Sequence, residues 1–228
     1  MKKKILVTAI AIGTLAFINT AFSETPHHAL SPQLAQQLSA EWWQLISSLP
    51  TDVNPQFDDS SGECVVGQRG DVWLLAGTFS GEPTTRTCSV PEGKGLYFPV
   101  INQYQFNSPN VCGQDGESLT ARQMRANIAP LINDATNLSV TLDGKMVKTI
   151  QRVKSDVFDV ALPEQNIYTY FGILPCPAGI YSPAVDDGYY AYIKKLNPGP
   201  HILHIHAESG AFIVDNTYNL TVVPVTLK

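Results

Sequence analysis

The stretch DGYYAYIKKLNPGPHILHIHA, residues 187–207, decides the fold class. It contains two runs rich in strand-forming residues, 189–196 and 202–207, separated by a turn sequence with two prolines and a glycine. In the second run Leu203 and Ile205 alternate with histidines, as in a strand that buries one of its two faces. The stretch therefore predicts two consecutive strands of a sheet with one buried face.

Outside this stretch, the chain continues as short strands separated by turn residues. The predicted strands cover residues 72–79, 96–101, 138–142, 145–150, 153–162 and 218–227. Asp143-Gly144 lies between two of them and suits the positive φ angles of a tight hairpin. Many short strands with few helices predict a mainly β fold, an antiparallel β-sandwich of immunoglobulin-like or jelly-roll-like type.

An amphipathic helix is predicted before the strands, over residues 31–49. Ser31 can cap the free backbone N–H groups, and Pro32 suits the first helical position. An apolar stripe recurs at helical spacing and consists of Leu34, Leu38, Trp42, Leu45 and Leu49. Pro50 ends this helix.

A second, short helix is predicted within the strand region, over residues 118–132. Thr120 and Gln123 have the spacing of a capping box, and Pro130 bends or ends the helix. No repeat, low-complexity tract or linker divides the chain. We therefore expect an N-terminal helical segment, 24–50, and a β-sandwich domain, 51–228, that form one unit.

The first residues have the features of a cleaved signal peptide. Three lysines at positions 2–4 precede an apolar run over residues 5–18, and the small residues Ala21 and Ser23 follow two apart. The run has 14 residues, fewer than the ~20 needed to cross a bilayer, and no later stretch is apolar enough to span. We predict a signal peptide over residues 1–23, and export to the periplasm or the medium.

The four cysteines agree with an oxidising compartment. They are even in number, and no C-x-x-C pair suggests a zinc site. Three pairings are open. We favour Cys64–Cys88 with Cys112–Cys176, because the first pair brackets one predicted strand and its flanking loops.

Composition excludes two broad classes of protein. The chain of 228 residues carries 15 Lys and Arg against 20 Asp and Glu, so it has no excess of positive charge to bind nucleic acid. A hydrophobic content of 44% with only 15% charged residues excludes intrinsic disorder.

Two resemblances support this interpretation. Residues 187–205 resemble the last strands of immunoglobulin-like domains in bacterial surface proteins. A wider set of segments is similar to a family of exported bacterial proteins of unknown function: GQRG (67–70), VWLLAGT (72–78), RTC (86–88), VPEGK (90–94) and FPVIN (98–102). This resemblance covers residues 42–205 and implies export and the β fold, but it implies no catalytic residues. Asp71 departs from the family pattern, in which we expect proline.

The best candidate for a metal site is the histidine cluster near the end of the chain. On a strand, His204 and His206 would share one face, with His201 on the other. Two imidazoles on one face could begin a zinc or copper site, with Glu208 or Asp186 as a further ligand. The alternative is a pair of solvated histidines on an outer strand.

A second candidate lies in the loop of residues 51–62. Asp52, Asn54, Asp58 and Asp59 could supply oxygen ligands for calcium. Phe57, however, stands where a hand-type loop needs glycine. The alternative is a turn in which these side chains bond to their own backbone.

Three further features suggest ligand binding. Asp186 and Asp187 could serve as the two carboxylates of a glycoside hydrolase, although neighbouring residues on a strand point apart. Arg86 could hold an anionic ligand. Trp43, next to Trp42, could stack on a sugar, but such a pair usually places one ring in the core and one at its edge. The second half of the chain also gathers aromatics that suit carbohydrate or protein binding: Tyr168, Tyr170, Phe171, Tyr181, Tyr189, Tyr190 and Tyr192.

The usual catalytic spacings, such as G-x-S-x-G, H-E-x-x-H and the phosphate-binding glycine loops, do not occur in the chain. We therefore expect a non-catalytic exported β-sandwich that binds a cell-surface glycan or a protein partner, with no resident cofactor. The alternative is an extracellular hydrolase that uses carboxylates or a histidine-bound metal.

Overall fold

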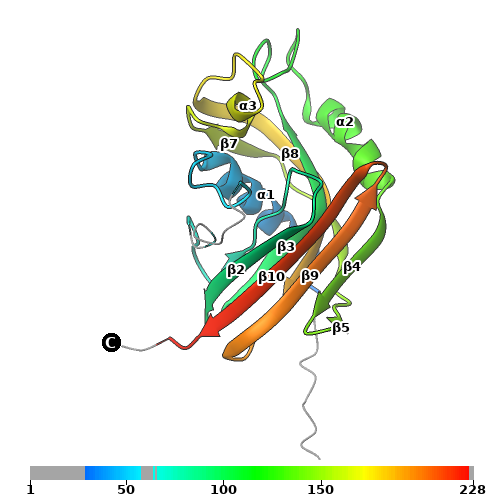
Figure 1. Cartoon of the computed structure of the whole chain (residues 1–228). Coiled ribbons are helices and arrows are strands. Elements are labelled where there is room, and N and C mark those ends of the chain that lie inside the picture. The colour runs from blue at the N-terminus through cyan, green and yellow to red at the C-terminus, as the bar shows by residue number, and fades with distance from the viewer. Residues whose placement is uncertain (1–28, 58–63, 65, 226–228) are drawn as a thin grey trace, which may run out of the picture.

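Two five-stranded sheets packed face to face form the body of the protein (Figure 1). The computed structural model describes residues 29–57, 64 and 66–225, so the predicted signal peptide lies outside the described residues. The mainly β, sandwich-like fold expected from the sequence is confirmed.

The first sheet has the order β1-β3-β8-β6, and β7 also pairs with β8. Its strands are β1 (Val72–Leu74), β3 (Gly95–Phe106), β6 (Gln151–Lys154), β7 (Phe158–Leu162) and β8 (Gly179–Ile193). The second sheet has the order β2-β10-β9-β4-β5. Its strands are β2 (Thr84–Pro91), β4 (Thr136–Leu142), β5 (Lys145–Met146), β9 (Gly199–Ser209) and β10 (Phe212–Val223). Two pairs, β1–β3 and β2–β10, are parallel, and the other pairs are antiparallel.

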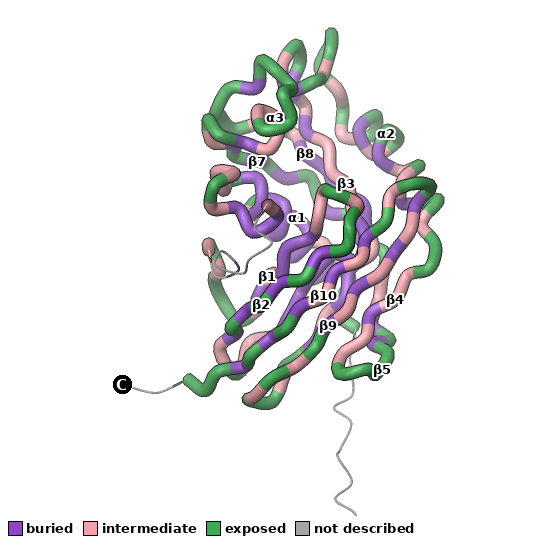
Figure 2. Tube along the Cα trace, in the orientation of Figure 1, coloured by how far each residue is buried: buried purple, intermediate pink, exposed green. Residues whose placement is uncertain are grey.

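Helices cover parts of the first sheet that the second sheet leaves open. Helix α1 (Pro32–Ser48) packs against β6, β7, β8 and β3 on the face opposite the second sheet, so β3 and β8 are buried along much of their length (Figure 2). Helix α2 (Ala121–Asn133) packs on β8 and β3 through Met124 and Ile128, which contact Val185. A short helix, α3 (Ile167–Tyr170), lies in the connection between β7 and β8.

The predicted helix ends and the hairpin turn are confirmed. Ser31 accepts a hydrogen bond from Leu34 N at 3.3 Å, and Thr120 with Gln123 forms the capping box of α2. Asp143 and Gly144 take φ angles of 50° and 75°, as a tight turn between β4 and β5 requires. These signals are local, which is why the sequence alone is enough to find them.

Several strand predictions were wrong in extent. The observed β3, β8 and β10 extend well beyond the predicted runs 96–101, 189–196 and 218–227, by up to ten residues at the start of β8. The run 72–79 is a strand only as far as Leu74, because the next two carbonyls accept hydrogen bonds from other elements. Leu75 O accepts from Trp42 Nε1 at 2.7 Å, and Ala76 O accepts from the Tyr218 hydroxyl at 2.7 Å. Residues 145–150 form a strand only over Lys145–Met146, and residues 153–162 are divided between β6 and β7.

The sequence did not predict strand β2. Its buried positions include Thr84 and Arg86, so the alternation of buried and exposed residues is not an alternation of apolar and polar ones.

Both predicted disulfides are confirmed, Cys64–Cys88 and Cys112–Cys176, and they indicate a non-reducing, exported environment. Within the described part of the chain, no helix combines the length and apolarity that a membrane crossing requires.

Candidate ligand-binding cavity

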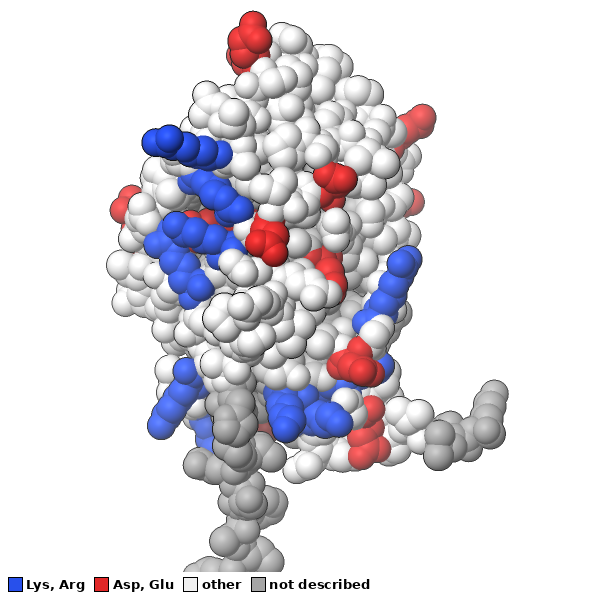
Figure 3. Space-filling model, turned by 180° about the vertical axis from the view of Figure 1, so that it is seen from behind, with Lys and Arg blue, Asp and Glu red and all other residues white. Residues whose placement is uncertain are grey.

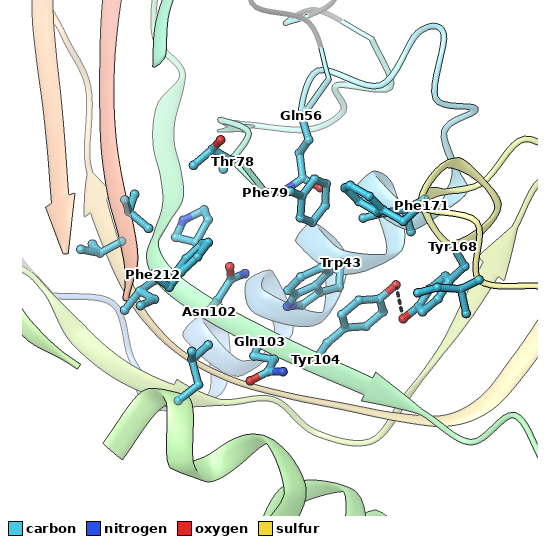
Figure 4. Close-up of a pocket in the computed structure, with 18 residues that line it drawn as sticks. Trp43, Gln56, Thr78, Phe79, Asn102, Gln103, Tyr104, Tyr168, Phe171 and Phe212 are labelled. Carbon is cyan, nitrogen blue, oxygen red and sulfur yellow. Dashed lines mark hydrogen bonds between the residues drawn. The ribbon is translucent and has the colours of Figure 1, made fainter. Parts of the chain in front are cut away.

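The candidate site lies beside strand β3, next to the part of this strand that is not paired with β1. β1 pairs with β3 only over Gly95–Tyr97, and among the described residues no strand continues along this side of β3. Residues 98–106 therefore form a free edge, with no described strand paired to them on this side. A cavity of about 370 Å³ lies beside this edge (Figure 4).

The cavity is lined mostly by apolar and aromatic side chains that come from both sheets, all three helices and three loops. The labelled aromatic rings are those of Trp43, Phe79, Tyr104, Tyr168, Phe171 and Phe212 (Figure 4). Of the described residues that line it, none is Asp, Glu, Lys, Arg or His. Charged side chains lie elsewhere, several of them grouped on the face seen from behind (Figure 3). The cavity therefore suits an uncharged ligand with a large apolar surface.

A stacked pair of rings forms one wall. The Trp43 and Tyr104 rings lie 3.9 Å apart between centroids and at 16° to each other. Trp43 Nε1 donates to Asp186 Oδ1 at 2.7 Å, and the Tyr104 hydroxyl is within 3.3 Å of Ser47 Oγ. Because both ends of the stack are hydrogen-bonded, the wall is held in place before any ligand arrives.

Both tryptophans of the Trp42–Trp43 pair are buried, which corrects the expectation of one ring in the core and one at its edge. Their rings meet edge to face, 4.8 Å apart. The Trp42 Nε1–H group donates a hydrogen bond to Leu75 O, and Trp42 does not line the cavity, whereas Trp43 does. Of the two, Trp43 is thus the one that a ligand can reach.

Asp186 lies behind this wall and is fully buried. Its Oδ1 accepts hydrogen bonds from Trp43 and from the Tyr190 hydroxyl, the latter at 2.9 Å. Burial raises the pKa of Asp186 to about 8, although hydrogen bonds with Trp43, Tyr190 and Ser39 lower it in part. Asp186 is therefore largely protonated at neutral pH and acts as a neutral support for Trp43.

Asp187 points to the opposite face of β8, so the two neighbouring carboxylates do not face one substrate. Arg152 holds it with two hydrogen bonds, Nε to Oδ1 at 2.9 Å and Nη2 to Oδ2 at 2.8 Å. Lys154 lies 3.8 Å from the same carboxylate. The geometry shown by glycoside hydrolases, with both acids on one cleft, is not present in this pair.

Gln56 contributes the most informative polar group of the cavity. Only 6% of the residue is exposed, and its Oε1 has no hydrogen-bond partner among the described residues. Its backbone is held on both sides, because Gln56 N donates to Asn54 Oδ1 at 3.0 Å and Gln56 O accepts from Arg86 Nη2 at 3.4 Å. A buried, unpaired amide oxygen costs roughly 1–3 kcal/mol.

The predicted calcium loop has a structural explanation where it is described. Asn54 is buried, donates to Ile46 O near the end of α1 at 2.8 Å and accepts from Gln56 N. It is thus a turn former of the alternative kind. Asp58 and Asp59 lie outside the described residues.

Arg86, which the sequence suggested as a partner for an anionic ligand, is buried, with its guanidinium carbon 5.8 Å from the centroid of the Tyr218 ring.

The histidines lie on the second sheet, far in the fold from Asp186. His204 and His206 share the outer face of β9, as predicted, but each pairs with its own carboxylate. His204 Nε2 lies 2.7 Å from Asp215 Oδ1, and His206 Nε2 lies 3.1 Å from Glu208 Oε1. Across the described part of the chain, no three His, Cys, Asp or Glu residues are placed to hold a metal together. Zinc or copper binding by this pair stays a prediction.

The residues of the cavity come from segments that are distant in the sequence. Trp43, Tyr168 and Phe171 were singled out as aromatics, but nothing local marked Gln56, Phe79, Tyr104 or Phe212. Comparison with known proteins gives no match to any family model, to any curated protein or to any solved structure. The case for function therefore rests on the geometry of the cavity.

Proposed function

We propose that the protein is an exported, non-catalytic binding protein that holds an uncharged, mainly apolar ligand in the cavity beside β3. Export would use the predicted signal peptide, 1–23, and the two disulfides agree with it. The observation that carries the proposal is the aromatic cavity of about 370 Å³, in which none of the described lining residues is charged.

The chemistry of the walls supports a neutral ligand. Six aromatic rings offer flat apolar surface, and no charged side chain among the described lining residues could neutralise an ion. An ionic group that entered would lose hydration without gaining a counter-charge. The polar groups present, Gln56, Asn102 and the free backbone edge of β3, suit hydrogen bonds to one or two neutral groups.

Of the partner classes expected from the sequence, a concave aromatic cavity favours a small molecule or the end of a glycan over a folded protein surface. The hydrolase alternative has less support. His204 and Asp186 lie in different sheets, and Asp186 is fully buried.

The first test is a titration of the purified, disulfide-bonded chain with 2-naphthol and with naphthalene-2-sulfonate, followed by naphthyl fluorescence. We expect naphthol to bind and the charged sulfonate to bind at least about tenfold more weakly. Phe171→Ala should weaken naphthol binding about fivefold, because this ring lines the cavity yet is 55% exposed, so the fold tolerates its loss.

The matched control is Ile180→Ala, which removes an apolar side chain that is 76% exposed and does not line the cavity. Naphthol affinity should be unchanged in this variant. Absence of naphthol binding, or equal losses in the two variants, would refute the proposed function.

A second test concerns the unpaired oxygen of Gln56. Wild type should prefer 2-naphthol, which has an O–H donor, over naphthalene, which has none. Gln56→Leu should abolish this preference while leaving the melting temperature equal or higher, because it removes an unsatisfied buried polar atom. A structural role for Gln56 would instead lower the melting temperature, which thermal unfolding of both proteins measures.

A further inference from the structure

A second, smaller cavity adjoins the first. It has a volume of about 270 Å³ and shares Gln103, Tyr104 and Tyr168 with the aromatic cavity. The hydroxyls of the two tyrosines lie 3.5 Å apart, which places a pair of polar groups at the junction. Burial raises the pKa of both tyrosines, so both hydroxyls are neutral. One ligand could therefore extend from one cavity into the other past this pair.

The second cavity differs from the first in its chemistry. Its walls carry four side-chain amides and a hydroxyl: Gln103, Gln105, Gln114, Asn127 and Ser108. Here too, none of the lining residues that the structure describes is charged at neutral pH. A polar but neutral chamber thus continues an aromatic one.

Not all of these amides are occupied by the protein itself. Gln114 is, because its Oε1 accepts from Ser108 N at 2.9 Å and its Nε2 donates to Glu117 O at 2.9 Å. Asn127 Nδ2 donates to Gln105 Oε1 at 3.1 Å. This leaves Asn127 Oδ1 as an acceptor and the side-chain NH₂ of Gln105 as a donor for other partners. The amide of Gln103 makes no hydrogen bond within the described chain, and Figure 4 shows it at the floor of the first cavity, beside Tyr104.

We infer that the ligand is a neutral amphiphile whose apolar ring system fills the aromatic cavity and whose hydroxylated group, such as a sugar ring, enters the amide-lined cavity. This inference rests on the proposed function, since it assigns the class of molecule that the same site takes. Hydroxyl groups both donate and accept, as side-chain amides do, so each can pair with the other in either direction. A phosphate, sulfate or ammonium group would find no counter-charge there.

A disulfide fixes the wall of the amide-lined cavity. Cys112 lines it and is bonded to Cys176, which lies between α3 and β8. Cys112 N also donates to Pro175 O at 2.8 Å. The loop of residues 107–119 is thereby tied to the segment that carries Tyr168. Both chambers are thus formed in advance, which lowers the entropy cost of binding.

The experiment compares 2-naphthyl β-D-glucopyranoside with 2-naphthol on the same disulfide-bonded protein. The two probes share the ring system and differ in one neutral sugar. We expect the glucoside to bind about tenfold more tightly, because a few neutral hydrogen bonds add to the same apolar contact. The double variant Gln105→Ala with Asn127→Ala should reduce this gain to about twofold or less, while naphthol affinity stays within about threefold of wild type, because both residues line the amide-lined cavity alone.

The matched control is Asn219→Ala, which removes an exposed amide that lines neither cavity and should preserve the tenfold gain. Naphthol binding without any gain for the glucoside would overturn this inference and leave the proposed function standing. So would a gain that survives the double variant. If neither probe binds, both proposals fail.

Discussion

The free edge of β3 and the outer face of β9 are opposites in chemistry and in how visible they are from the sequence. The face of β9 presents closely spaced histidines, each paired with a carboxylate and each open to solvent. The edge of β3 borders a cavity whose described lining residues are all uncharged and come from segments far apart in the chain. The first region attracts attention in the sequence, and the second is where the fold leaves space for a ligand.

The comparison teaches that residue type alone is a poor guide to a site in this molecule. Each of the two histidines on the outer face of β9 pairs with a nearby carboxylate. Water screens these exposed pairs, so they contribute little to stability. The cavity lies instead beside the part of β3 beyond Tyr97, which β1 does not pair with. The aromatic side chains around this edge line the space but do not fill it.

The largest effect should come from removing the disulfide beside the amide-lined cavity. Cys112→Ser with Cys176→Ser should lower the free energy of unfolding by roughly 4 kcal/mol, on the chain-entropy model for a closed loop of 64 residues. It should also weaken binding of the naphthyl glucoside at least about tenfold, because the wall of that cavity is no longer fixed. Urea denaturation and the fluorescence titration measure the two effects.

The other disulfide provides the control. Cys64→Ser with Cys88→Ser opens a loop of 24 residues and should cost roughly 3.5 kcal/mol on the same model. Neither cysteine lines either cavity, so probe affinity at temperatures where the variant stays folded should be unchanged. Equal losses of affinity in the two double variants would contradict the role given to Cys112–Cys176.

A smaller effect is expected from Asp186, which supports the cavity wall. Its pKa is about 8 in the folded protein, against about 4 in the unfolded chain, so the folded state binds more protons between these pH values. The free energy of unfolding should therefore decrease as pH rises from about 4 to about 8. Asp186→Asn should remove that slope, so the stability of this variant relative to wild type should increase between pH 5 and pH 7.

The measurement is urea denaturation of both proteins at several pH values between 4 and 8. Asp187→Asn is the matched control, and it should lower stability, because it takes away the carboxylate that Arg152 and Lys154 contact. The groups that bear on Asp186 are Trp43 and Ser39 on α1, Tyr97 on β3, and Tyr190 and Asp187 on β8. A pH slope that persists in Asp186→Asn would assign the effect to another group.

The parts of the fold that the sequence predicts are those set by local signals. Ser31 with Pro32 begins α1, Thr120 with Gln123 begins α2, and Asp143-Gly144 forms the hairpin turn, since each needs only its near neighbours. The class of fold follows from alternation along the chain, and the favoured one of three open disulfide pairings is confirmed.

The site could not be predicted in the same way, because it depends on contacts over long distances in the sequence. β1 ends at Leu74 because side chains of Trp42 and Tyr218 take the next two carbonyls, and the end of β1 creates the free edge. Gln56 stands out only in the structure, where it is buried and its side-chain oxygen has no hydrogen-bond partner. The sequence contains these residues but not their positions relative to one another.

The smallest effect is expected on the histidine face. The side chains of His204 and Asp215 are 39% and 36% exposed, and ion pairs of this kind contribute roughly 0–1 kcal/mol. His204→Ala should therefore change the free energy of unfolding by less than about 1 kcal/mol, and the change should shrink further at high salt, because salt screens exposed pairs. Probe affinity should not change, since His204 lines neither cavity. The same unfolding experiment with added zinc makes the comparison decisive: a melting temperature that zinc raises in wild type but not in His204→Ala would give this face a metal site, and the contrast with the edge of β3 would no longer hold.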